Sequence, residues 1–77
     1  NGITALESEK ILLKFAFNKL KLNKVYSIIN VNNEGQILLI ERLGMKKDGI
    51  LRNHFIQNGK YIDASLYSIL STEFKYF

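Results

Sequence analysis

Two polar side chains in the second half of the chain could form an acid–base pair. His54 and Asp63 lie on either side of Asn58-Gly59, the residue pair that best fits a two-residue type I′ hairpin turn. With that turn, His54 faces Asp63 across two antiparallel strands, and Arg52 lies on the same face. A histidine oriented by a carboxylate can act as a general base. The alternative is a polar pair on the surface of a hairpin, and both interpretations stay open at this point.

The start of the chain could bind an anion. Thr4 and Glu7 have the spacing of a capping box, in which a hydroxyl and a carboxylate each accept a hydrogen bond from a backbone amide. Helix N-termini attract phosphate groups because their amides lack acceptors within the helix and the helix dipole is positive there. The alternative is an ordinary capped helix, and the negative charge of Glu7 would oppose a bound anion.

Several other kinds of site have no counterpart in the sequence. The chain has no Cys and a single His, so a metal site is not expected. It has no Walker loop, no Gly-x-Ser-x-Gly motif and no paired catalytic carboxylates. No apolar run reaches the roughly 18 residues that a membrane-spanning helix needs, so we expect no membrane span.

The net charge of +4 has two interpretations. Scattered lysines fit a solvated surface, and they would also attract a nucleotide phosphate or nucleic acid. The aromatic residues of the C-terminal part are better explained by β-propensity and core packing than by base stacking. We therefore do not expect nucleic acid as a partner. These aromatic residues are Tyr61, Tyr67, Phe74, Tyr76 and Phe77.

The hydrophobic pattern predicts five elements in the order α-β-α-β-β. Helical spacing of apolar residues marks the first helix, and Asn33 is a suitable N-cap for the second. Gly44 lies where a left-handed helix end is expected. The predicted elements are a helix over 4–19, a strand over 25–31, a helix from 33 to the cap at 44, and strands over 50–57 and 60–70.

The same pattern predicts which faces are buried. On the first helix, Ile11, Leu12 and Phe15 widen the apolar stripe, so much of that helix should be buried. The strand over 25–31 has apolar residues at both odd and even positions, which suits a strand that is covered on both faces. The last strand alternates, so one face should be apolar and the other polar. The turn pairs Gln57 with Lys60, Ile56 with Tyr61, Phe55 with Ile62, and His54 with Asp63.

The segment from Asn33 to Asp63 resembles the C-terminal half of the Gcn5-related N-acetyltransferases. It reads Asn-Glu-Gly-Gln-Ile-Leu-Leu-Ile-Glu-Arg-Leu-Gly-Met, then Lys-Lys-Asp-Gly-Ile-Leu-Arg, then Asn-Gly-Lys-Tyr-Ile-Asp. In that family an Asn opens an aliphatic helix that closes in Gly-Phe, and a strand and hairpin follow. The stretches Gly49–Arg52 and Asn58–Asp63 look most like amino-sugar acetyltransferases of the pseudaminic-acid pathway.

The resemblance implies a cosubstrate, acetyl-coenzyme A, and an amine acceptor. In the family, the loop before the first helix holds the coenzyme pyrophosphate, and the Asn that opens the second helix contacts the pantetheine arm. Ile40 stands where many members carry a Tyr that protonates the leaving thiolate, so no catalytic residue is assigned. The implied cofactor-binding residues are Gly2, Ile3, Thr4, Ala5 and Asn33, and the acceptor-side candidates are Arg52, His54 and Asp63.

The resemblance also implies an α/β fold with a mixed sheet that ends in a β-hairpin, with the last strand between the two before it. The strand near residue 28 would then have a bare outer edge, which upstream strands or a partner chain would cover. Residues 1–77 would be a single partial acetyltransferase domain, cytoplasmic and able to form a homo-oligomer through this edge.

Two alternatives to an amino-sugar N-acetyltransferase stay open. One is a protein N-terminal acetyltransferase of the ribosomal-protein type. The other is a non-catalytic, self-associating or nucleic-acid-binding small basic module. Binding to coenzyme A would favour the enzyme, whereas strongly salt-dependent binding would favour the nucleic-acid module.

Overall fold

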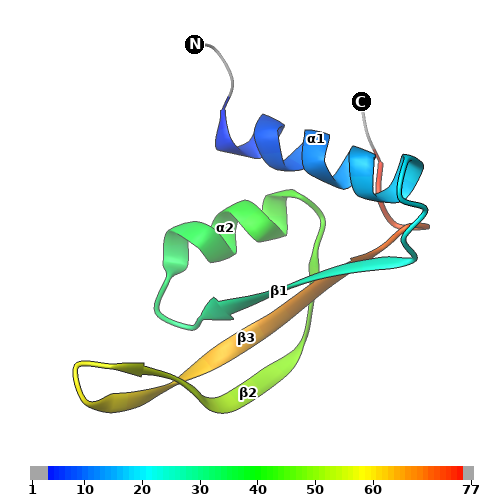
Figure 1. Ribbon diagram of the computed structural model, residues 1–77. Coiled ribbons are helices and arrows are strands. Elements are labelled where there is room, and N and C mark those ends of the chain that lie inside the picture. Colours follow the sequence, from blue (N-terminus) through cyan, green and yellow to red (C-terminus); the bar gives the residue numbers. More distant parts are fainter. Residues whose placement is uncertain (1–3, 76–77) are drawn as a thin grey trace.

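The computed structural model describes residues 4–75, which fold into a three-stranded sheet with two helices (Figure 1). The strand order is β1-β3-β2, and both pairings are antiparallel. The last strand of the chain therefore lies between the other two, as predicted. The elements are α1 (Ala5–Asn18), β1 (Lys24–Asn30), α2 (Glu34–Arg42), β2 (Lys46–Gln57) and β3 (Lys60–Leu70).

Both helices begin and end at residues that the sequence marks. The hydroxyl of Thr4 accepts a hydrogen bond from the Glu7 amide (3.1 Å), and the Glu7 carboxylate accepts one from the Thr4 amide (3.3 Å). Asn33 caps α2 by accepting from the Gln36 amide at 3.2 Å. Gly44 follows α2 with φ of +93°, a backbone conformation that glycine adopts without steric cost. The capping predictions are confirmed.

The hairpin that joins β2 and β3 has the predicted turn and register. Asn58 and Gly59 have φ of +53° and +75°, as a type I′ turn requires. Gln57 pairs with Lys60, and the next two predicted pairs also form. β2 begins at Lys46, four residues before the predicted start at Ile50, because its first residues pair with the far part of the long strand β3.

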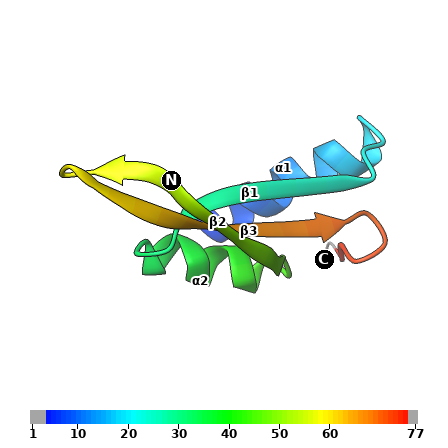
Figure 2. The ribbon, with the colours of Figure 1, turned by 90° about the horizontal axis from the view of Figure 1, so that it is seen from below.

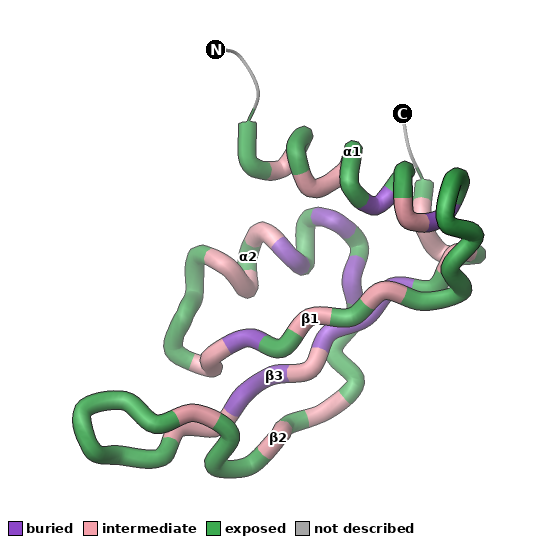
Figure 3. Tube along the Cα trace, in the orientation of Figure 1, coloured by how far each residue is buried: buried purple, intermediate pink, exposed green. Residues whose placement is uncertain are grey.

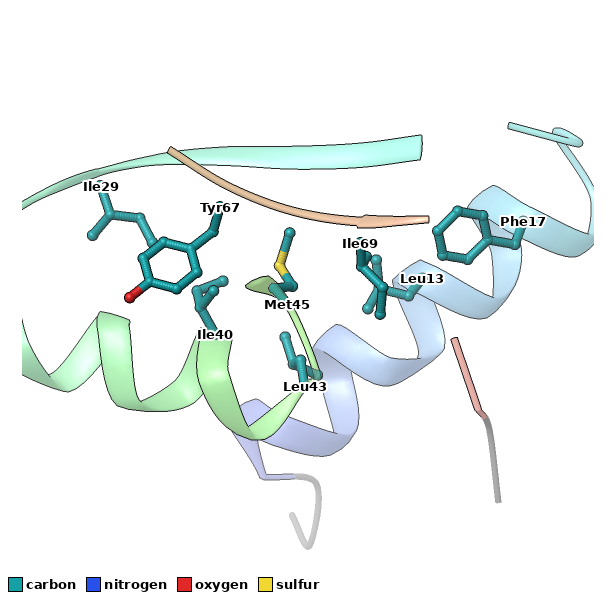
Figure 4. Close-up of a cluster of buried hydrophobic side chains, with 8 residues drawn as sticks. All are labelled: Leu13, Phe17, Ile29, Ile40, Leu43, Met45, Tyr67 and Ile69. Atoms are coloured by element: carbon teal, nitrogen blue, oxygen red, sulfur yellow. The ribbon is translucent and has the colours of Figure 1, made fainter. Parts of the chain in front are cut away.

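The core lies between the helices and one face of the sheet (Figures 3 and 4). On β3, Tyr67 and Ile69 point into it. The predicted division of this strand into an apolar and a polar face is wrong, because Ala64 and Ser68, which lie on the other face, are buried as well. Ile40 of α2 is 2% exposed and packs in the same cluster. The buried members are Leu13, Phe17, Ile29, Ile40, Leu43, Met45, Tyr67 and Ile69.

Two surfaces that the sequence predicts as buried are open within residues 4–75. On α1, Ile11, Leu12 and Phe15 are 50%, 60% and 53% exposed, so only the narrow stripe with Leu13 and Phe17 is buried. On β1, alternate residues such as Tyr26 are exposed, so this strand is covered on one face only. In Figure 2 the strands pass in front of α1. These two predictions are wrong for the described part of the chain.

The segment after β3 closes the end of the core next to α1. The Ser71 amide donates to the Asn23 carbonyl at 2.8 Å, which holds the chain beside the start of β1. The ring of Phe74 then lies against that of Phe17, with centroids 5.4 Å apart.

Among the described residues, no helix is both long enough and apolar enough to cross a membrane.

Candidate functional site

The start of α1 keeps two backbone amides that could bind a ligand. The capping box occupies the amides of Thr4 and Glu7, whereas those of Ala5 and Leu6 have no acceptor within the helix. The carboxylate of Glu7 lies in the same exposed turn, so its charge opposes an anion there. Of the four predicted phosphate-binding residues, Thr4 and Ala5 lie at this turn, and the other two, Gly2 and Ile3, lie outside the described residues.

Four carboxamide side chains surround the start of α2. Asn30 accepts from the Asn32 amide through Oδ1 (2.8 Å) and donates through Nδ2 to Oε1 of Gln57 (3.2 Å). This second bond ties the hairpin to the end of β1. Asn33 uses Oδ1 to cap the helix, which leaves its Nδ2 for a ligand. An open depression of about 320 Å³, here the carboxamide depression, is lined by Asn30, Asn32, Asn33 and Gln57.

A bulge in β2 separates His54 from the position that the sequence predicts. Regular pairing stops after Leu51 and resumes at Phe55, so Arg52–His54 lie opposite the single residue Asp63. Asn53 has φ of +51°, and its amide donates to Oδ1 of Asp63 at 2.8 Å. The predicted direct pairing of His54 with Asp63 is therefore wrong, because the carboxylate binds the backbone of the bulge.

The bulge nevertheless gathers the three predicted acceptor-side residues. Arg52, His54 and Asp63 line one open depression of about 790 Å³, here the bulge depression, together with Asn53 and two apolar residues of β2. The carbonyl of Asp63 accepts from the Val31 amide at 3.2 Å, so the same residue also contacts the end of β1. Sequence reasoning missed Asn53, although Asn is one of the few residue types that tolerate positive φ.

Position 40 belongs to the core and offers no titratable group. Ile40 packs against the sheet beside Tyr67, the one tyrosine of the buried cluster within residues 4–75 (Figure 4). The Tyr67 hydroxyl donates to Oε2 of Glu41 at 3.0 Å. Burial raises the pKa of Tyr67 above its usual value, and the neighbouring Glu41 carboxylate raises it further. Within residues 4–75 there is no cluster of three or more His, Cys, Asp or Glu residues that could hold a metal ion.

Comparison with known protein sequences gives consistent matches. Residues 3–66 match the family described as acetyltransferase (GNAT) domain. The uncharacterized N-acetyltransferase YoaA of Bacillus subtilis is 30% identical over 70 residues, which are 91% of this chain and 39% of that protein. A second Bacillus subtilis protein, YdaF, has ribosomal N-acetyltransferase in its name. It is 34% identical over 64 residues, which are 83% of this chain and 35% of that protein.

A solved structure shares the arrangement of the elements. A mutant of the spermidine N-acetyltransferase from Vibrio cholerae superposes with a TM-score of 0.85 at 29% identity, over 88% of this chain and 40% of that one. The chain thus spans about two fifths of the length of the curated relative YoaA and of this solved structure.

Proposed function

This chain belongs to the GNAT acetyltransferase family, and we propose that it forms the cofactor-binding part of an N-acetyltransferase. The match over residues 3–66 carries this proposal. Acetyl-coenzyme A is the acetyl donor of this family. In the proposed reaction the acceptor amine attacks the thioester carbonyl, the carbon–sulfur bond breaks, and the amine proton is released as coenzyme A leaves. The protein contributes by holding the amine and the thioester in line.

The residues at the two helix starts suit the cosubstrate. Thr4 and Ala5, with Gly2 and Ile3 before them, would face the pyrophosphate. The Nδ2 of Asn33 would donate to a carbonyl of the pantetheine arm, because its Oδ1 already caps α2.

On the acceptor side we propose the bulge depression with Arg52, His54 and Asp63. His54 is the only imidazole among the residues that line this depression, so it is the proposed general base. Ile40 has no proton to give, so another group or water would protonate the leaving thiolate. We propose an amino sugar of the pseudaminic-acid type as the acceptor, on the stretches Gly49–Arg52 and Asn58–Asp63. A protein N-terminus is the second candidate, because YdaF carries a ribosomal N-acetyltransferase name.

We also propose that residues 1–77 form part of one larger acetyltransferase domain. The exposed side chains of Ile11, Leu12 and Phe15 form an apolar surface on α1, and contiguous surfaces of this kind are usually covered. The unpaired edge of β1 is a second such surface. Further strands of the same domain, or a second copy of the chain, would cover both.

The test is thermal melting of the chain with and without millimolar acetyl-coenzyme A, at low and high salt. A rise in melting temperature that persists at high salt supports the cofactor site, because a ligand that binds only the folded state stabilises it. Release of free thiol from acetyl-coenzyme A with a panel of primary amines, using the whole natural protein that carries this chain, then tests the reaction. A cooperative melt without any shift, together with no thiol release, would contradict the proposal.

A further inference from the structure

We propose that the carboxamide depression binds the hydroxyl groups of an amino-sugar acceptor and discriminates against polyamines. This rests on the proposed acetyltransferase function and deepens it by naming a subsite for the hydroxyl groups of the acceptor. The lining residues are Asn30, Asn32, Asn33 and Gln57. All four are neutral, and each carboxamide can both donate and accept a hydrogen bond. Such a lining matches hydroxyl groups, which also donate and accept.

The hydrogen bonds within the depression leave donors that face a ligand. Asn30 uses both its oxygen and its nitrogen in internal bonds, so its side chain is fixed. Gln57 uses Oε1 and Asn33 uses Oδ1 in the described bonds. The NH₂ group of Gln57 is therefore the group available to sugar oxygens, because that of Asn33 is assigned to the pantetheine arm.

The side chains that line the two depressions disfavour a polyamine, although the carboxylate of Glu34 follows Asn33 at the start of α2. A polyamine carries several ammonium groups, which are best bound by carboxylates. Among the residues that line the carboxamide and bulge depressions, Asp63 is the only carboxylate, and its Oδ1 already accepts from the Asn53 amide. Arg52 and His54 lie beside it, and the whole chain carries a net charge of +4.

Gln57 connects this specificity to the cofactor side. It lies in the last position of β2, just before the hairpin turn. Its bond to Asn30 holds the end of the hairpin beside the end of β1. Asn30 lies three residues before Asn33, the residue that is assigned to the pantetheine arm. A sugar in the carboxamide depression would thus lie next to the arm that delivers the acetyl group. In this proposal Gln57 is a binding residue, and its bond to Asn30 fixes its side chain.

The test measures acetyl transfer by the whole natural protein that carries this chain to glucosamine, to spermidine and to a short peptide with a free N-terminus. We expect the highest kcat/KM for glucosamine. Gln57→Ala should raise the KM for glucosamine about three- to tenfold, the cost of one neutral hydrogen bond, with kcat little changed. Gln57→Glu should lower the KM for spermidine, because it adds a carboxylate. Asn23→Ala, at the other end of β1, is the matched control.

The outcomes separate this proposal from the proposed function. A preference for spermidine or for the peptide, or an unchanged KM in Gln57→Ala, overturns the sugar subsite and leaves the acetyltransferase function intact. If no amine is acetylated, the proposed function fails. The subsite is then decided by titrating the ¹⁵N-labelled chain with glucosamine. Shifts of the Gln57 side-chain amide signals support it, and their absence overturns it.

Discussion

The hydroxyl of Tyr67 donates a hydrogen bond to Oε2 of Glu41, and this 3.0 Å bond joins the buried face of the sheet to α2. Tyr67→Phe keeps the ring in the core and removes only the bond. We expect it to lower the free energy of unfolding by about 1–2 kcal/mol in urea titrations. Tyr61→Phe, at a position 65% exposed, should change it by less than about 0.5 kcal/mol. Equal effects of the two changes would show that the Tyr67 bond adds no stability.

The same tyrosine should make the free energy of unfolding fall at alkaline pH. Burial, and then the Glu41 carboxylate, raise the pKa of Tyr67, so the folded state holds this proton more tightly than the unfolded state. The corresponding stability is present below the ordinary tyrosine pKa of about 10 and is lost as the pH rises through the higher folded-state pKa. Above pH 9, the melting temperature should therefore fall more steeply with rising pH for the natural chain than for Tyr67→Phe. Parallel curves would contradict this.

Ile40 should behave as a core residue rather than as a vacant catalytic position. It is 2% exposed, so Ile40→Ala should cost about 2–4 kcal/mol of unfolding free energy through the cavity it leaves. Ile40→Tyr, which restores the phenol common in the family, should cost about 1–3 kcal/mol by overpacking. Leu38→Ala, on the exposed side of the same helix, is the control. If Ile40→Tyr is tolerated without loss of stability, the core has room that the structure does not show.

The left-handed backbone at Asn53 should decide how the bulge tolerates substitution. With φ of +51°, Asn53→Gly should be neutral or slightly stabilising. Asn53→Ala should cost about 1 kcal/mol, because Ala lacks the short polar side chain that lets Asn adopt this conformation. Chemical denaturation of both variants measures the difference. If the two are equally stable, the bulge rearranges when its residue changes.

Two carboxyl groups should make the chain sensitive to acid. The Ser68 hydroxyl lowers the pKa of Asp48, and Lys46, then the Leu70 amide, lower that of Glu73. A lowered pKa in the folded state gives stability above the ordinary carboxyl pKa of about 4, and this stability is lost as the pH falls through the folded-state value. Asp48→Asn and Glu73→Gln should each flatten the decline of the melting temperature below pH 4. Glu9→Gln is the control for loss of a carboxylate.

Glu7 should weaken coenzyme binding if the pyrophosphate lies at the start of α1. Glu7→Gln keeps an oxygen for the Thr4 amide and removes the charge that opposes an anion. We expect the affinity of the chain for coenzyme A to rise about two- to fivefold, the usual size of a charge effect at a helix end. Isothermal titration calorimetry measures it, with Glu9→Gln as the comparison. No change would place the pyrophosphate elsewhere.

Local signals in the sequence predicted the elements and their ends well. The capping box at Thr4, the N-cap at Asn33 and the turn at Asn58-Gly59 depend on neighbours a few residues away, and all three form. The order of the strands came from the family resemblance, because β1 and β3 pair over a long separation that no local pattern encodes.

The wrong predictions concern features that depend on residues far apart in the sequence, such as the burial of α1 and the pairing of His54 with Asp63. The periodicity of α1 shows that Ile11, Leu12 and Phe15 are apolar, but it cannot show what covers them, and within residues 4–75 nothing buries them. The predicted facing of His54 and Asp63 assumed an unbroken ladder. The Asp63 carboxylate instead binds the Asn53 amide, which the turn signal at residues 58 and 59 does not reveal.

The central place of β3 has a consequence for how the chain folds as it leaves the ribosome. Lys24 of β1 pairs with Leu70, a residue that is made 46 positions later (70 − 24). During synthesis β1 and α2 therefore emerge before β3, the strand that pairs with β1 within residues 4–75, and until then Ile29 and Ile40 lack their packing partners on β3. Contacts over such separations form slowly because a long loop must close first. This part of the nascent chain is thus more exposed to proteases and chaperones before β3 is complete than afterwards.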